Sequence, residues 1–305
     1  MANVKAPVEV DPGKENVRHP LDNILNFRDV GKTINDFLGE KRVAEGRLYR
    51  SARPDDATPS DRVRLREEYN IKTILDLRTV TEHENQAKKR EALAAPVQSN
   101  GTLAEPVKIP GINYLEVNIN GKGFERSLLW RLSTWSLAKL LTLTAFGYRM
   151  EAVSILGREV LQPRGLIGLG FDSIDHCGPE IAESLRAFTS LPNYGILVHC
   201  TQGKDRTGLI IALILFLLEI PLSAITNDYC MSEEELLPEK ESRMAEIQSI
   251  GLTEEFARCP KDWVEKMDEY IRERYGGVQE YCRVIGFGDL EQESLLLNLT
   301  HKRDV

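Results

Sequence analysis

Short apolar runs alternate with longer polar or mixed stretches through the first two hundred residues. Four of these runs, at residues 47–50, 71–77, 112–119 and 195–199, have the length and composition of buried strands. A helix is predicted over residues 58–69, because this stretch opens on Thr-Pro-Ser-Asp, which are good capping residues. Strands separated by helices predict an α/β fold with a mostly parallel central sheet flanked by helices on both faces. Ligands of such folds bind at the carboxyl ends of the strands.

The pattern changes after the last of these strands. The run from Leu209 to Leu218 is strongly apolar but too short to cross a bilayer, so we interpret it as a buried helix. Further along, glycines separate stretches with helical character, which predicts a helical C-terminal part. The helices are expected at residues 223–229, 238–250, 261–275 and 289–299.

Residues 124–150 form the other unusual stretch. They contain Trp130 and Trp135, many leucines, four basic residues and one acidic residue, Glu125. The internal charges exclude an ordinary transmembrane helix. Three interpretations stay open: helices packed on the sheet, which is the commonest outcome, a lid over the ligand site, or an amphipathic segment in peripheral contact with a membrane. Four glycines between residues 157 and 170 then predict a flexible return to the main domain.

We interpret the chain as one domain preceded by a tail. Residues 1–20 are polar and contain proline, and we expect them to be flexible; they lack the apolar segment of a signal peptide. Residues 21–305 are then a single domain, with ample material for a core and with an insertion at about 121–171.

The composition describes an ordinary globular protein, with 28% charged and 42% hydrophobic residues. A net charge of −8 argues against a general nucleic-acid binder, so no nucleic-acid partner is expected. The five cysteines are odd in number and lack metal-ligand spacing, which indicates a reducing, cytoplasmic setting. We expect no metal and no other cofactor. A disulfide between Cys200 and a second thiol such as Cys177 would protect the sulfur from further oxidation.

The chemistry of the chain is concentrated in the ten residues His-Cys-Thr-Gln-Gly-Lys-Asp-Arg-Thr-Gly at 199–208. A cysteine and an arginine six positions apart, on a short loop that opens a helix, can bind a phosphate dianion and attack it. The loop amides and the helix dipole would hold the phosphoryl oxygens, and Arg206 would grip two of them through its planar fork. The same groups would stabilise Cys200 as a thiolate. The stretch therefore predicts a phosphatase.

The remaining loop residues have supporting roles in this interpretation. Thr201, Gln202, Gly203 and Lys204 would bind phosphate through the loop, where the glycine supplies the backbone freedom that a curled loop needs. The Thr207 hydroxyl would stabilise the thiolate and later the leaving thiol. The alternative for the whole stretch is a buried cysteine at a strand end, followed by a solvated turn.

His199 is expected to orient the loop by hydrogen bonding rather than to transfer a proton. An ordinary half-buried histidine is the other interpretation of this position.

The reaction also needs an acid, because the leaving oxygen departs more easily when it is protonated. Asp205 lies inside the loop and could project over the phosphate, although it could instead pair only with Lys204 or Arg28; we favour catalysis. Asp76 ends a strand expected to neighbour the loop's strand, where it could face the crevice or equally hydrogen-bond the backbone. Asp172 and Asp175 are interpreted as N-cap residues of a helix.

Two further groups of charges are ambiguous. Lys204 would add a cation at the pocket edge and favour a substrate with a second phosphate, or it would pair with an acidic neighbour; the two interpretations carry equal weight. Arg28 could also line the pocket. For Asp29, Arg50 and Arg78 we prefer buried ion pairs that hold the N-terminal segment to the sheet.

Taken together, these pieces resemble the bacterial and fungal tyrosine/serine protein phosphatase family, which carries a His-Cys-x-x-Gly-Lys-Asp-Arg-Thr-Gly loop. The likeness covers roughly residues 22–120 and 172–299, and the loop is its most specific part. The other similar segments, in the family's order, are Asn26 to Gly31, Gly46 to Ser51, Asp76 to Arg78 with Glu82 or Glu84, Asp228-Tyr229, and Arg274 to Gly276.

The resemblance implies a tyrosine-phosphatase-like fold and metal-independent hydrolysis through a phosphocysteine, with the loop aspartate, here Asp205, as the acid. Members of the family act on phosphotyrosine, phosphoserine and phosphothreonine, and some act on phosphoinositides. A phosphorylated protein or a phosphoinositide is therefore the expected partner, and a non-catalytic phosphate-binding module is the alternative from another class. Gln202 departs from the alanine common in relatives, and the long segment 121–171 suggests a fungal type.

Overall fold

A five-stranded sheet forms the centre of the computed structural model, which describes residues 20–94 and 107–301. Its order is β1-β2-β5-β3-β4; β1 pairs antiparallel with β2 and all the other pairs are parallel. The prediction of a mostly parallel sheet is confirmed, and only the short edge strand β1 was not expected. The strands are β1 (Arg28–Asp29), β2 (Leu48–Ser51), β3 (Thr73–Asp76), β4 (Asn113–Glu116) and β5 (Ile196–His199). The tail predicted for residues 1–20 lies almost entirely outside the described residues.

The central strands contribute side chains to two separate cores. Leu75 and Val198 belong to the larger core, whereas the preceding residues Ile74 and Leu197 belong to the smaller one. Successive side chains of a strand point to opposite faces, so both faces of the sheet are covered. The smaller core is closed by α2 (Pro59–Glu67) and by the chain entering the sheet over residues 21–27.

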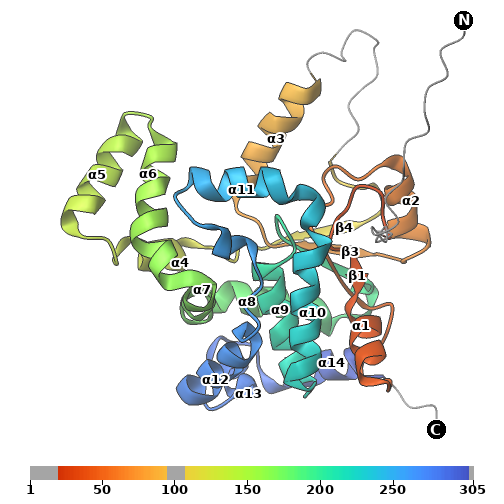
Figure 1. The fold of residues 1–305 in the computed structure, drawn as a ribbon. Helices are drawn as coiled ribbons and strands as arrows, with labels where there is room; N and C mark the ends of the chain where they lie inside the picture. The colour runs from red at the N-terminus through yellow and green to blue at the C-terminus, as the bar shows by residue number, and fades with distance from the viewer. Residues whose placement is uncertain (1–19, 95–106, 302–305) are drawn as a thin grey trace, which may run out of the picture.

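Most helices pack on the larger core (Figure 1). The helix expected at 223–229 is longer than predicted, and a helix at 278–284 was not expected. The elements on this side outside the insertion are α1 (Val30–Leu38), α8 (Gly178–Arg186), α9 (Asp205–Leu217), α10 (Leu222–Glu235), α12 (Trp263–Tyr275), α13 (Val278–Val284) and α14 (Asp289–Leu299).

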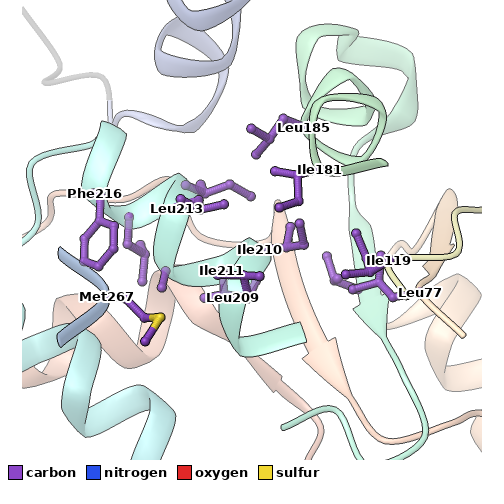
Figure 2. Close-up of a cluster of buried hydrophobic side chains, with 14 of the residues drawn as sticks. Leu77, Ile119, Ile181, Leu185, Leu209, Ile210, Ile211, Leu213, Phe216 and Met267 are labelled. Carbon is purple, nitrogen blue, oxygen red and sulfur yellow. The ribbon is translucent and has the colours of Figure 1, made fainter. Parts of the chain in front are cut away.

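Helix α9, which follows the loop at residues 200–204, lies in the middle of this core. Every residue from Thr207 to Leu217 is buried, as the apolar run predicts. Figure 2 shows Ile181 of α8 and Met267 of α12 among the side chains that surround α9. Because neighbours hold α9 on several sides, its N-terminus has a fixed position next to the end of β5.

The segment expected as an insertion consists of helices. Its elements are α4 (Lys122–Leu129), α5 (Thr134–Ala145), α6 (Arg149–Leu156), the π-helical turn η2 (Gly157–Leu161) and α7 (Gln162–His176). Helices α5 and α6 form a hairpin that projects from the body of the molecule (Figure 1). The flexible return predicted from the glycines is wrong: these residues continue as helix, with a kink at Gly165, where φ is 59° and ψ is 178°.

The hairpin has one packed face and one exposed face. Leu137, Leu140 and Leu143 of α5 pack against the larger core, whereas Trp135 of the same helix is 77% exposed. Trp130, at the end of α4, is 81% exposed. Among the residues the structure describes, none of the helices combines the length and the apolar character needed to cross a membrane.

Truncation of a side chain inside α9 tests this arrangement. Leu213 is fully buried, so Leu213→Ala should lower the free energy of unfolding by about 2–5 kcal/mol, because the surrounding helices cannot collapse fully into the cavity. Urea denaturation followed by circular dichroism measures the change. Leu141→Ala, at a position 57% exposed on α5, is the control and should change stability by less than about 0.5 kcal/mol. Equal losses in the two variants would contradict the buried position of α9.

Candidate active site

The loop of residues 200–204 joins the end of β5 to the start of α9, at the carboxyl edge of the sheet. Gly203 has a φ of +64°, in the left-handed region that favours glycine. A Cβ atom at this position would lie 1.9 Å from the carbonyl oxygen of Ser51 in β2. The loop therefore needs glycine here for both its backbone angle and its close approach to the neighbouring strand.

Hydrogen bonds from outside the loop turn its carbonyl groups away from the centre. The Asn26 amide donates to the carbonyl oxygens of Gln202 and Gly203, both at 3.0 Å, and Arg50 donates to that of Gly203 at 2.7 Å. In a trans peptide the N–H points opposite to the C=O, so the loop amides face inward. Within the described ranges no protein oxygen accepts from the amides of residues 201–204. These donors are available to an anion.

A buried ion network holds the two residues that orient the loop. Asp228 of α10 accepts from Arg28 at 2.7 Å and from Arg50 at 2.5 Å, and Arg28 also donates to the side chain of Asn26. Burial opposes the charge on Asp228, but the two guanidinium groups outweigh it and lower the pKa of its carboxyl group. The suggestion that Arg28 lines the pocket is wrong in this structure, because its donors are taken up by this buried network.

The preference for buried ion pairs is confirmed at Arg50 and Arg78. Arg78 donates through both Nη atoms to Asp55, at 2.5 and 2.9 Å, and it also pairs with Asp76. Asp29 differs: it caps α1 by accepting from the Lys32 amide at 3.2 Å rather than forming an ion pair.

The guanidinium of Arg206 is held by Glu82, which lies in the first turn of α3 (Val80–Ala94). Arg206 donates through Nη1 and Nη2 to the two carboxylate oxygens, at 2.7 and 2.6 Å, and the Thr201 hydroxyl donates to the same carboxylate. Burial opposes ionisation of Glu82, but these hydrogen bonds lower its pKa to about 2.

The two terminal nitrogens of the Arg206 guanidinium thus bind Glu82, while the side edge of the guanidinium, formed by Nε and Nη2, is unoccupied. Nε and the second hydrogen of Nη2 have no acceptor among the described residues, and together they form a second bidentate donor pair. Glu82 can therefore orient Arg206 while the arginine binds an anion. In the sequence, Glu82 was only one of two glutamates in the family resemblance, and no role was predicted for it.

Cys200 is only 3% exposed, at the bottom of the loop. Cys177 belongs to the same core, but all five cysteines are free thiols, so the suggested protective disulfide is not formed in this structure. The Thr207 hydroxyl is buried and has no hydrogen-bond partner in the part of the chain that is described. It is therefore available to donate a hydrogen bond to the Cys200 sulfur or to a bound anion.

His199 is fully buried between the loop and β3. Its Nδ1 lies 3.1 Å from the carbonyl oxygen of Cys200, and its Nε2 lies 3.4 Å from a carboxylate oxygen of Asp76. Burial lowers the pKa of His199, which favours the neutral ring. This placement supports an orienting role for the histidine.

Asp76 accepts hydrogen bonds from both the backbone amide and the guanidinium of Arg78. Burial opposes ionisation, but the hydrogen bonds and the charge of Arg78 keep the pKa of Asp76 below its usual value. A carboxylate with these partners stays ionised near neutral pH. This geometry favours the interpretation that Asp76 shapes the backbone over the interpretation that it donates a proton.

Lys204 is not at the pocket edge, as one interpretation of the sequence required. Its side chain is fully buried, and Nζ donates to the carbonyl oxygens of Phe256 and Arg258, both at 2.8 Å. Phe256 belongs to the 3₁₀ turn η6 (Glu254–Ala257), whose carbonyl groups replace the water around the ammonium. Lys204 can therefore contribute only its backbone, and not its ammonium, to anion binding by the loop.

Asp205 is the first residue of α9, and its side chain is 45% exposed. It lies 3.5 Å from Lys204, so the predicted pairing exists, whereas Arg28 is engaged elsewhere. The Oδ1 atom of Asp205 is buried without a hydrogen-bond partner among the described residues, while the side chain as a whole is partly open to solvent.

The interpretation of Asp172 and Asp175 as helix N-caps is wrong. Both lie within α7, and the N-cap of α8, the helix that leads towards β5, is Cys177. Asp172 is buried and pairs with Arg131 and Arg164, each at 2.7 Å. Asp175 accepts from the hydroxyl groups of tyrosines in and at the end of α12.

Two cavities meet the loop from different sides. A polar cavity of about 600 Å³ is lined by Thr201, Gln202 and Glu82, together with residues of α3 and α11 (Lys240–Ser249). An apolar cavity of about 620 Å³ is lined by Asp205 and Arg206, together with residues of α4 to α7 and α12. The ion pair between Glu82 and Arg206 therefore joins the linings of the two cavities. Over residues 20–94 and 107–301, no three His, Cys, Asp or Glu side chains form a group that could hold a metal ion.

Comparison with known proteins agrees with this architecture. The model of the tyrosine phosphatase family matches residues 19–301, nearly the whole chain. The protein belongs to this family of phosphatases, which are hydrolases, and the resemblance drawn from the loop is confirmed.

Two curated relatives bear the name tyrosine-protein phosphatase. The protein from Nostoc commune is 25% identical over 167 residues, which cover 49% of this chain and 56% of the relative. The protein from Cupriavidus necator is 26% identical over 241 residues, which cover 77% of this chain and 71% of the relative. The match to the first of these thus spans little more than half of that protein.

Removal of the charge on Asp228 tests the buried network. Asp228→Asn should lower the free energy of unfolding by about 3–5 kcal/mol, because two buried guanidinium groups lose their counterion. Asp36→Asn removes one partner of an exposed pair with Lys32 and should cost less than about 1 kcal/mol. Urea denaturation of both variants makes the comparison, and a loss below 1 kcal/mol at Asp228 would show that the network does not anchor the loop.

Acid stability tests the pairing of Glu82. Its folded pKa of about 2 is below its ordinary value of 4.5, so the ionised carboxylate stabilises the protein above that ordinary value, and the contribution disappears as pH falls towards 2. Glu82→Gln should lower the free energy of unfolding by about 2 kcal/mol at pH 7, and this difference should shrink between pH 5 and pH 3. Glu68→Gln on the exposed surface is the control. A difference that stays constant with pH would exclude the ion pair as its cause.

Proposed function

We propose that this protein is a cysteine-dependent phosphatase that hydrolyses phosphomonoesters, with phosphotyrosine and also phosphoserine and phosphothreonine as substrates. The observation that carries the proposal is the loop of residues 200–206. It combines a buried cysteine, inward-facing amides without protein acceptors, and an arginine whose side edge is open. A site of this kind binds a tetrahedral dianion and presents a nucleophile to its phosphorus atom.

In the first step, the loop amides and the side edge of Arg206 hold the three non-bridging oxygens. The Cys200 sulfur attacks phosphorus in line with the ester oxygen, so that the P–S bond forms while the P–O bond breaks. Asp205 donates its proton to the departing oxygen, which leaves as an alcohol or a phenol. Glu82 contributes by holding Arg206 in the plane that this geometry requires.

In the second step, water attacks the phosphorus of the phosphocysteine. Asp205, now a carboxylate, accepts a proton from the water, and the P–S bond breaks to return Cys200 as a thiolate and to release inorganic phosphate. The buried Thr207 hydroxyl is available to stabilise the departing sulfur. The same aspartate thus serves as acid and then as base.

Two features favour Asp205 over Asp76 as the acid. Asp205 has a partly exposed side chain at the lining of a cavity, whereas Asp76 is buried, paired with Arg78 and has a pKa of about 2. Asp76 would also have to break its short hydrogen bonds to Arg78 before it could hold a proton.

Hydrolysis of an inositol phosphate or a phosphoinositide is the second candidate. The ammonium of Lys204 no longer supports it, because backbone carbonyls hold that group away from solvent. The polar cavity supports it instead, since Arg53, Lys88 and Arg243 line a space that also contains Thr201 and Gln202. A multiply phosphorylated substrate could use these cations.

The mechanism needs Cys200 in its reduced form. All five cysteines are free, so we propose that the protein acts in a reducing, cytoplasmic setting. We also propose that the exposed tryptophans of the α4–α5 region make peripheral contact with a membrane.

Phosphate release in the presence of a metal chelator tests the proposed function. The substrates are p-nitrophenyl phosphate, a phosphotyrosine peptide, a phosphoserine peptide and a soluble phosphoinositide. Cys200→Ser should lose at least about 10⁴-fold in kcat, because the nucleophile is removed. Asp205→Asn should lose about 10²-fold or more on phosphoserine and much less on p-nitrophenyl phosphate, whose leaving group needs no proton.

Asp76→Asn is the matched comparison for the acid, and it should not reproduce this dependence on the leaving group. If Asp76→Asn shows the dependence and Asp205→Asn does not, the assignment of the acid is reversed. Binding of phosphopeptide without any turnover by the wild-type protein would favour the non-catalytic binding module.

A further inference from the structure

Most of the apolar cavity beside the loop has no role in the proposed chemistry. Its volume is about 620 Å³, within the range typical of small-molecule sites. The insertion and its surroundings supply most of the wall, through side chains such as Phe124, Leu128, Leu140, Leu156 and Phe256. The charged lining residues are Glu125 and, from the loop side, Asp205 and Arg206.

The cavity begins where the ester group of a bound substrate would lie. Arg206 presents its side edge to the phosphate, and the same residue lines the cavity together with Asp205 and Leu209 of α9. Asp205 is the proposed donor to the leaving oxygen, so that oxygen must lie near the Asp205 carboxylate. Whatever is attached to the leaving oxygen is therefore directed towards the cavity.

We infer that this cavity binds an apolar part of the substrate: among phosphomonoesters, the enzyme prefers those whose leaving group carries an alkyl chain or an extended apolar ring system. The inference rests on the proposed function, because it takes the phosphate site at Cys200 and Arg206 as given. The driving force is removal of apolar surface from water. A phosphoserine side chain offers almost no such surface.

This chemistry could come from a dissolved amphiphile or from a lipid in a bilayer. Two observations bear on the bilayer source. The outer surface of the insertion exposes Trp130 and Trp135, and residues 121–171 contain seven Lys or Arg and three Glu in a chain of net charge −8. Aromatic and basic residues together suit an anionic interface. The experiment below has a separate arm for each source.

The first arm measures kcat/KM for 4-alkylphenyl phosphates from methyl to hexyl, at concentrations below micelle formation. The acidity of the phenol hardly changes along this series, so a trend reports binding of the chain. Wild-type kcat/KM should rise at least about thirtyfold from methyl to hexyl, which is roughly twofold per methylene and below the fourfold expected for complete burial.

A pair of threonines on α5 provides a matched control. Thr144 lines the cavity and Thr142 does not, although both are exposed and both hydroxyl groups bond to the carbonyl four residues earlier. Thr144→Trp should fill the cavity and reduce the rise to less than about threefold, while turnover of 4-methylphenyl phosphate is kept. Thr142→Trp should behave as the wild type.

A flat wild-type series, with 4-methylphenyl phosphate turned over, would overturn the inference and leave the proposed function intact. An unchanged rise in Thr144→Trp would also overturn it. If no member of the series is turned over, the proposed function fails, and calorimetric binding to Cys200→Ser decides the inference. Tighter binding of the hexyl than of the methyl compound, lost in the Thr144→Trp background, supports the cavity; equal binding excludes it.

The second arm presents phosphatidic acid at 20 mol% in phosphatidylcholine vesicles. Turnover that falls at least tenfold in a Trp130→Ser, Trp135→Ser double variant, with the soluble series unchanged, assigns the bilayer source. Turnover of the soluble series without turnover of the vesicles assigns a dissolved amphiphile.

Discussion

The site depends on one buried carboxylate. Asp228 lies in α10, far along the chain from Arg28 and Arg50, and it neutralises both at the same time. These arginines, directly or through Asn26, bind the carbonyl groups of residues 202–204 and thereby set the direction of the loop amides. A loop of free N–H donors is costly to hold without a ligand, and this network supplies the rigidity. The loop is thus organised from its outer side, before any anion binds.

The same loop separates two chemical environments. On one side, Glu82 and the residues of α3 and α11 form a polar cavity, and on the other side the insertion forms an apolar one. The ion pair of Glu82 with Arg206 connects the two and leaves the side edge of the arginine open. In the proposed function, recognition of the phosphate and recognition of the group it is attached to therefore use different surfaces.

Much of the fold was predictable because the signals are local. The β2, β3, β4 and β5 strands follow from short apolar runs, α9 from its continuous apolar sequence, and the reactive loop from the spacing of Cys200 and Arg206. The partners of charged residues were not predictable, because they depend on contacts across the chain. The ammonium of Lys204 donates to carbonyl groups about fifty residues further along the chain. Asp172 pairs with Arg164 in a segment that is helical, although its glycines had predicted a flexible return. Glu82 had no distinguishing local signal, since Glu84 lies two residues further on.

The position of Lys204 has a consequence for how the molecule assembles. Its ammonium is fully buried, and its backbone acceptors, Phe256 and Arg258, come from the final fifth of the chain. Until those residues arrive during synthesis, the ammonium of Lys204 depends on water in place of its native carbonyl partners. Cys200, Gly203 and Arg206 are all present by residue 206, yet Lys204 reaches its native contacts only when the segment 254–258 has packed against the loop. This later segment is for that reason a component of the candidate active site and not an appendage to it.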